Sequence, residues 1–156
     1  MSDPDIWLRW LHVIGATVLF GTGAGIAFFM LRAHRTGDAR VIAHVAGTVV
    51  TADLLFTATA VVVQPVTGAL LAWRTGWPLD TPWIVASLIL YVVTGLFWLP
   101  VVWMQARMRD LARAAAAENA PLSPAYYRLY RLWFWFGFPA FAAVLAILWL
   151  MIARPA

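Results

Sequence analysis

The sequence predicts an all-α polytopic membrane protein, a bundle of four helices with both termini outside. Hydrophobic residues make up 63% of the 156 positions and charged residues only 12%, whereas soluble domains contain about 25% charged residues. Four apolar runs are each long enough to cross a bilayer core of about 30 Å as a helix, and none shows strand alternation. Helices suit lipid because they satisfy their own backbone hydrogen bonds. This composition, with no cysteine, excludes a disordered chain, a disulfide scaffold and most soluble enzymes.

The predicted spans lie within a single domain of residues 1–156. They cover about residues 6–31, 41–73, 82–104 and 132–153. The first is expected to stay as an anchor, because Asp3 and Asp5 stand where a signal peptide has basic residues.

The later spans contain helix-breaking and helix-starting signals. Gln64-Pro65 is predicted to break the second helix, since proline leaves the carbonyl of Val61 without its helical donor. The third helix is expected to continue into the connection of residues 105–131 and to end at residues 120–122. Ser123-Pro124 is typical of an N-cap followed by a first-turn proline, so the fourth helix should begin before it enters the membrane.

The arginines predict the orientation of the bundle. The connections after the first and third spans lie on one side of the membrane and carry most of the arginines: Arg32, Arg35, Arg40, Arg107, Arg109, Arg113, Arg128 and Arg131. The opposite side carries only Arg9, Arg74 and Arg154. The positive-inside rule places both connections in the cytoplasm, with the protein in a bacterial inner membrane. Topology and attraction to anionic lipid account for the net charge of +4, so no nucleic-acid partner is expected.

The tryptophans follow the pattern of two interfacial belts, as amphipathic indoles do at lipid–water boundaries. The outer belt would contain Trp7, Trp10, Trp73, Trp77, Trp83 and Trp149, and the inner belt Trp98, Trp103, Trp133 and Trp135.

Polar residues inside the spans are the candidate functional residues, because they are costly in lipid. His12 shares a helix face with Gly15, where small residues leave room for a neighbouring helix or a flat ligand. Counting depth along the helices places Gln64 and Tyr91 near His12, which predicts an outer polar cluster able to bind a cofactor.

A second candidate site lies deeper, at Asp53 with Thr57 on the same helix face. No arginine lies within reach, so the carboxyl is expected to rest protonated and bonded to threonine or tyrosine. Both His12 and Asp53 also have a structural interpretation, in which their side chains only hold neighbouring helices together through hydrogen bonds. His44 and His34 are expected at the membrane surface, and no spacing predicts a metal site.

Two further features concern partners. Gly21 and Gly25 form a small-xxx-small pair that allows close helix contact, within the bundle or in a homodimer. The cytoplasmic connection could hold a protein partner.

Several segments resemble a family of small bacterial integral membrane proteins without an established activity, the DUF2269 family. The segments are Leu8–Gly15, Phe20–Gly23, Phe29–His34, Ala52–Thr57, Gln64–Gly68, Trp98–Gln105, and Arg131–Phe134 with Pro139–Phe141. More distantly, the opening Leu-His and the Arg-x-His ending are similar to the CopD copper-handling type and the HemJ haem-binding type. That similarity implies His12 as a haem ligand and haem b as a possible cofactor. His12 and His44 are separated by more than about 20 Å in depth, so they could not share one haem.

Three functions remain open from the sequence. The first is a haem- or quinone-linked redox component that uses His12. The second is a non-catalytic accessory or scaffold protein, and the third a small-solute or proton-coupled transporter that uses Asp53.

Overall fold

A computed structural model describes residues 3–155, with side chains from Asp5 onward, and confirms the all-α bundle. The elements are α1 (Asp3–His34), α2 (Ala39–Ala52), the π-helical turn η1 (Asp53–Thr57), α3 (Ala58–Thr75), α4 (Pro82–Glu118) and α5 (Pro124–Ala153). Because α2, η1 and α3 form one continuous helix, residues 3–155 contain four helices long and apolar enough to cross a membrane. The described residues contain no strand.

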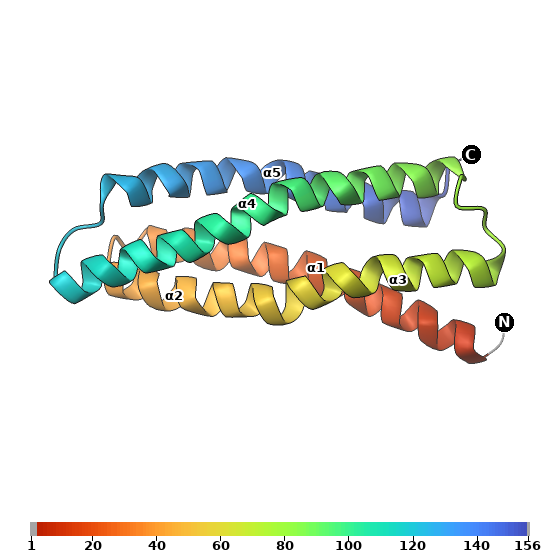
Figure 1. Ribbon diagram of the computed structural model, residues 1–156, viewed down its shortest axis with the longest axis horizontal. Coiled ribbons are helices and arrows are strands. Elements are labelled where there is room, and N and C mark those ends of the chain that lie inside the picture. Colours follow the sequence, from red (N-terminus) through yellow and green to blue (C-terminus); the bar gives the residue numbers. More distant parts are fainter. Residues whose placement is uncertain (1–2, 156) are drawn as a thin grey trace.

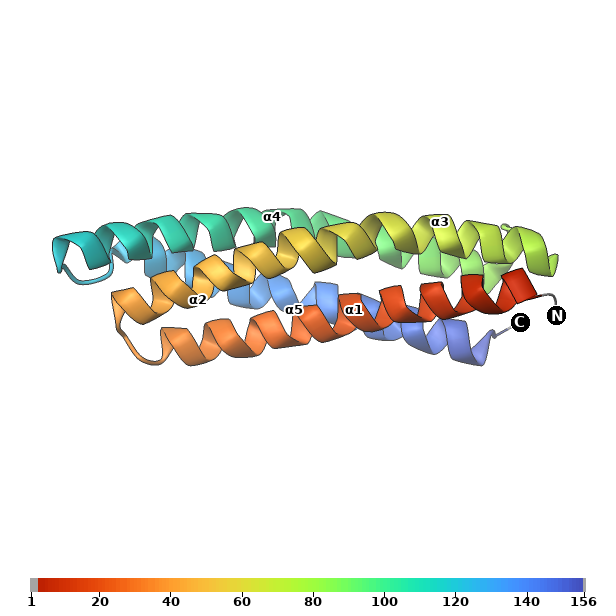
Figure 2. The ribbon, with the colours of Figure 1, turned by 90° about the horizontal axis from the view of Figure 1, so that it is seen from below.

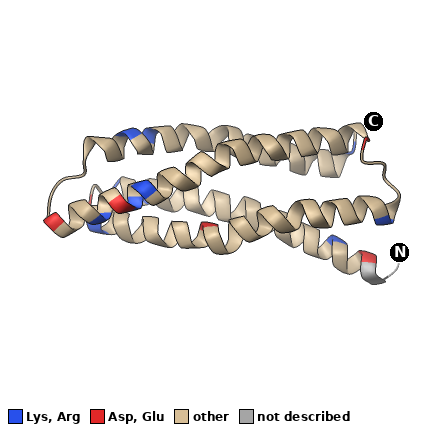
Figure 3. Ribbon diagram, in the orientation of Figure 1, with Lys and Arg blue, Asp and Glu red and all other residues tan. Residues whose placement is uncertain are grey.

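The four long helices run antiparallel, with the described ends of the chain together at one end of the bundle (Figures 1 and 2). We call this the terminal end. The other, the connection end, holds the α1–α2 and α4–α5 connections, and most of the arginines gather there (Figure 3). α4 packs along α5, whereas α1 packs on α2 and α3. This arrangement agrees with the alternating spans that the sequence predicts.

Local signals in the sequence explain where the helices begin and end. The Asp38 carboxylate accepts a hydrogen bond from the Arg40 backbone N–H at 2.8 Å and caps α2. α3 ends at Gly76, whose φ of 74° suits a residue without a Cβ. Ser123 caps α5 by accepting from the Tyr126 N–H, and Pro124 follows in the first turn.

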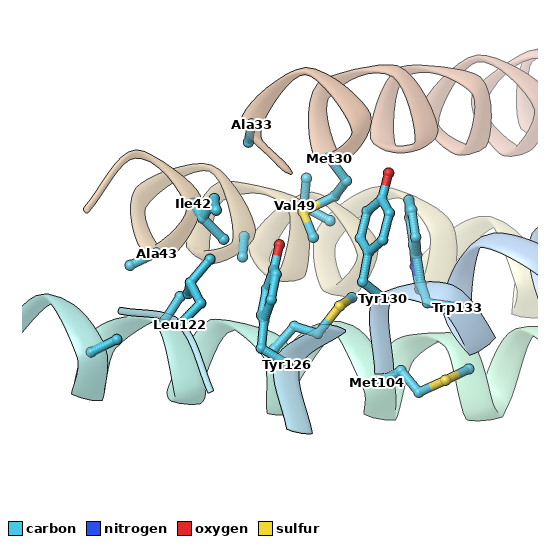
Figure 4. Packing of buried hydrophobic residues seen from close by; sticks show 14 of the residues in the cluster. Met30, Ala33, Ile42, Ala43, Val49, Met104, Leu122, Tyr126, Tyr130 and Trp133 are labelled. Carbon is cyan, nitrogen blue, oxygen red and sulfur yellow. The ribbon is translucent and has the colours of Figure 1, made fainter. Parts of the chain in front are cut away.

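The hydrophobic core lies in the half of the bundle next to the connection end, and Figure 4 shows how its side chains pack. Met30, Ile42, Met108 and Tyr126 are fully buried there, one from each long helix. Ala112 and Ala115 are also buried, so the part of α4 beyond residue 104 packs as a regular part of the bundle. Toward the terminal end the buried apolar residues are fewer and mostly small: Ala60, Ala72, Ile84 and Ala143.

Large apolar side chains cover the outside of the bundle, as expected for a surface that faces lipid. Trp103 and Trp135 are 60% and 69% exposed, which fits the predicted inner belt. Trp98 and Trp133 do not fit it. Trp133 is buried and Trp98 half-buried, because their indole N–H groups bond to polar side chains inside the bundle.

The irregularity in the second membrane-crossing helix is the π-turn η1. The predicted break at Gln64-Pro65 is wrong, because α3 runs through Pro65 without interruption. A π-turn holds one residue more than an α-turn, and here Leu54, Leu55 and Phe56 all face outward (63%, 62% and 54% exposed). The helix also changes partners at η1, since α2 packs on α4 and α1 whereas α3 packs mainly on α1.

Candidate functional site: two polar clusters between the helices

The first polar cluster surrounds Asp53, the acidic residue at the start of η1. Its side chain faces the interior and Asp53 is only 3% exposed. The Trp98 indole N–H from α4 donates to Oδ1 at 3.5 Å. No arginine or histidine pairs with Asp53 among residues 3–155. Asp53 is therefore a buried carboxyl group whose partners carry no charge.

Gln105 connects Asp53 to α5. In the amide orientation that satisfies both neighbours, Gln105 Nε2 donates to Asp53 Oδ2 at 2.6 Å, and its Oε1 accepts from Trp133 Nε1 at 3.1 Å. Gln105 is 1% exposed and Trp133 is 5% exposed. The chain of bonds thus ties η1 to α4 and α5 through side chains that are almost completely buried, where an unpaired polar group would be costly.

The second polar cluster joins α1 to α3 nearer the terminal end. His12 Nδ1 lies 2.8 Å from the Thr67 hydroxyl oxygen, and the Thr67 hydroxyl also bonds to the Val63 carbonyl at 2.8 Å. The Gln64 amide nitrogen lies 3.1 Å from the same His12 nitrogen. Since both contacts use Nδ1, Nε2 is the ring nitrogen that forms no hydrogen bond with the described residues.

Two glycines bring the helices of this second cluster together. Gln64 Nε2 donates to the His12 carbonyl at 2.9 Å, and its Oε1 accepts from the Ala16 N–H at 3.0 Å. A Cβ at Gly15 would come within 2.8 Å of the Gln64 amide, and one at Gly68 would lie 3.2 Å from the His12 ring. The room that the sequence predicts beside Gly15 is therefore filled by Gln64.

Tyr91 bonds to the backbone of α3 and not to the side chain of His12 or Gln64. Its hydroxyl donates to the carbonyl of Val61, the same carbonyl that Pro65 leaves without a helical donor. Tyr91 is half-buried on α4, so this bond reaches across to α3. The structure thus brings His12, Gly15 and Gln64 together and places Tyr91 about one turn away, at the proline-freed carbonyl.

Three members of these clusters are absent from the sequence-based prediction. Thr67 lies one turn after Gln64, and that spacing could have revealed it. Gln105 falls just past the predicted end of the third span, and Trp133 matches the pattern of an interfacial anchor. Asp53 was expected to bond to threonine or tyrosine. Trp98 and Gln105 bond to it, no tyrosine among the described residues does, and Thr57 is buried one turn further along the helix.

The other two histidines lie at the connection end. His34, expected to be solvated or interfacial, stacks on Tyr130 with ring centroids 3.5 Å apart and planes 8° from parallel. Its Nδ1 lies 3.2 Å from the Tyr126 hydroxyl. His44 is exposed on α2.

The residues present do not form a haem pocket within one chain. His12 is about 33 Å from His34 along α1, and His44 also lies toward the connection end, so His12 cannot share one iron with either of them. The space beside Gly15 is occupied by Gln64, and the His12 ring packs against Gly68. Within the described residues, no group of three or more histidine, aspartate or glutamate side chains could hold a metal ion.

Comparison with known proteins assigns the chain to a family but not to an activity. No curated protein and no solved structure matches it. The similarity to the CopD and HemJ types therefore stays a prediction. The sequence profile of the family described as "Predicted integral membrane protein (DUF2269)" matches residues 6–155. Four apolar membrane-length helices agree with that description, and the chain belongs to the DUF2269 family of predicted integral membrane proteins.

Proposed function

We propose that this protein moves protons across the membrane, alone or together with a small solute, and that Asp53 binds and releases the proton. The observation that carries the proposal is a carboxyl group, 3% exposed, inside a membrane-length helix and without a cationic partner among the described residues. A carboxylate in the middle of a membrane helix costs about 2.5–3.5 kcal/mol on insertion scales, and such residues commonly lie on proton relays.

The hydrogen bonds around Asp53 hold one carboxyl oxygen more closely than the other. Gln105 holds Oδ2 closely at 2.6 Å, whereas the Trp98 donor is 3.5 Å from Oδ1. Oδ1 is therefore the oxygen with the weaker contact, and it is the one that would carry the proton in the neutral acid. Two N–H donors stabilise the ionised form as well.

Polar groups continue from Asp53 along the inward face of the helix. They recur every three or four residues, which keeps them on one side of a helix. From Asp53 to Thr67 the helix rises about 21 Å, roughly two-thirds of a hydrocarbon core of about 30 Å. The groups are Thr57, the Val61 carbonyl with Tyr91, Gln64, and Thr67 with His12.

Proton flux into proteoliposomes tests this function. Vesicles containing the full chain and a pH-sensitive dye are given a potassium diffusion potential. We expect acidification above that of empty vesicles, loss of it with Asp53→Asn, and retention with Asp110→Asn, a control at an exposed carboxyl on α4. Wild-type flux equal to that of empty vesicles, or full flux with Asp53→Asn, would refute proton transport and favour the accessory function.

The orientation and the partners are also proposals. We place both termini outside and the connection end in the cytoplasm, on the excess of arginines there. A C-terminal alkaline phosphatase fusion should be active and a C-terminal fluorescent protein dark in a bacterial host. The reverse result would overturn this orientation.

A homodimer through α1 is supported by open space at its glycines. A Cβ at Gly21 would meet no atom within 4 Å, and one at Gly25 would meet only Phe29. The bundle therefore does not use this pair for its own packing. Gly21→Leu should convert a dimer in detergent into a folded monomer, and an unchanged dimer would exclude this interface.

A further inference from the structure

A groove on the outside of the bundle, near the connection end, lies apart from both polar clusters. Its volume is about 640 Å³, and one face of α2 and η1 forms its floor. The residues that line it are Ala43, His44, Gly47, Thr48, Thr51, Ala52, Leu55, Phe56 and Arg113. Arg113 is the contribution of α4.

The polarity of the groove changes along its length. His44 and Arg113 lie at the end near the connections, and Leu55 and Phe56 lie toward the middle of the bundle. From His44 to Phe56 the helix rises about 18 Å, slightly more than one leaflet of a hydrocarbon core of about 30 Å. The groove is thus basic where a headgroup would lie and apolar where an acyl chain would lie.

Arg113 supplies a positive charge that forms no salt bridge in the described part of the protein, and Asp110, the acidic group that interacts with it at longer range, pairs directly with Arg109. Arg74 pairs with Asp5 at 2.6 Å and Arg109 with Asp110 at 2.9 Å, but Arg113 forms neither an ion pair nor a hydrogen bond there. Its Nη2 would lie 3.4 Å from a Cβ at Gly47, so the guanidinium rests over the floor of the groove.

The position of Arg113 suits the headgroup layer. It follows the exposed Trp103 by about 15 Å along α4, and side chains on a helix tilt toward its N-terminus, which for α4 is the direction of Trp103. The hydroxyls of Thr48 and Thr51 donate to carbonyls of their own helix. Arg113 is therefore the strongest donor that faces the groove.

We infer that this groove binds one anionic phospholipid, with the phosphate on Arg113 and an acyl chain along Ala52, Leu55 and Phe56. A guanidinium can bind phosphate oxygens through two parallel N–H bonds, which gives it a preference for phosphate. Basic pockets on the cytoplasmic side of membrane helices recognise anionic headgroups for the same reason. An amphipathic lipid matches both ends of the groove, whereas a free anion would leave the apolar part uncovered.

Native mass spectrometry of the detergent-solubilised full chain tests the site. The protein is titrated with phosphatidylglycerol or with phosphatidylcholine, and the fraction that carries one lipid is measured. Arg113→Gln should weaken phosphatidylglycerol binding about fivefold, the effect of about 1 kcal/mol for one arginine near a lipid surface. Arg128→Gln, at an exposed arginine of α5 outside the groove, is the matched control and should bind as the wild type does.

A second variant removes the space and leaves the charge. Gly47→Leu fills the floor beneath Arg113 and should reduce binding of both lipids, whereas Arg113→Gln should affect phosphatidylglycerol alone. Equal losses with Arg113→Gln and Arg128→Gln would show diffuse attraction and overturn the site. The site would also be overturned if Gly47→Leu bound lipid normally, or if the wild type did not prefer phosphatidylglycerol.

Discussion

The bond between Tyr91 and the Val61 carbonyl allows a sharp test of how the bundle tolerates a proline within a membrane helix. Pro65 has no N–H, so Val61 lacks its helical donor, and the Tyr91 hydroxyl takes that place from α4. Tyr91→Phe removes only the hydroxyl and keeps the ring. Pro65→Ala restores an N–H that can reach Val61 from within α3. The two substitutions should therefore depend on each other.

The size of the effect follows from the two local environments. In the wild-type background, Tyr91→Phe leaves a half-buried carbonyl without a donor, which costs about 1–3 kcal/mol in water-soluble proteins. Hydrogen bonds between membrane helices average about 0.6 kcal/mol and reach about 1.7. We expect a loss of about 1 kcal/mol. In the Pro65→Ala background the loss should fall below about 0.5 kcal/mol, because the backbone N–H introduced by the alanine satisfies the carbonyl.

The assay is reversible unfolding in mixed micelles, followed by helical circular dichroism as the denaturing detergent is increased. Four proteins are compared: the wild type, each single variant and the double variant. The difference between the two Tyr91→Phe losses is the coupling energy. Equal losses in both backgrounds would mean that the hydroxyl does not act through the proline-freed carbonyl, and would falsify the reasoning.

Two other predictions use the same assay and matched pairs of residues. Gly15→Leu should cost about 1–3 kcal/mol, because its side chain needs the space that the Gln64 amide occupies. Gly95→Leu on α4 is the matched control, because a Cβ there meets no atom within 4 Å, and it should leave the stability unchanged. Equal losses would contradict the packing at Gly15. Trp133→Phe should cost about 1–2 kcal/mol, because the buried Gln105 oxygen loses its donor. Trp135→Phe, at a side chain 69% exposed, should stay within about 0.5 kcal/mol of the wild type. Equal losses with the two variants would count against the assignment of Trp133 to the polar cluster.

The fold was largely predictable because lipid imposes simple requirements. An apolar run of sufficient length must be a helix there, so the spans follow from composition. The ends of the helices at Asp38, Gly76 and Ser123 follow from residue types that satisfy free backbone groups or tolerate a positive φ.

The sequence predicted the ionisable residue of each polar cluster but not the side chains that bond to it. His12 and Asp53 stand out because any ionisable residue within an apolar run does. Their partners depend on which helix faces which, and one sequence does not contain that information. Trp133 illustrates the difficulty, since an indole can anchor at the interface or donate inside the bundle. The π-turn was also hidden, because Asp53, Thr57 and Gln64 share one face of an ordinary α-helix as well.

The extra residue in η1 has a consequence for how this helix can change in length. In an ordinary membrane helix, the deletion of one residue rotates the rest of the helix by about 100°, so the side chains after the deletion no longer face their former partner helices. A π-turn already contains the surplus residue, so the loss of one residue from Leu54–Phe56 would leave a regular α-turn with α2 and α3 still facing their present partners. The three lipid-facing residues of η1 thus mark a place where a span of this protein can be shortened by one residue without changing which helix touches which.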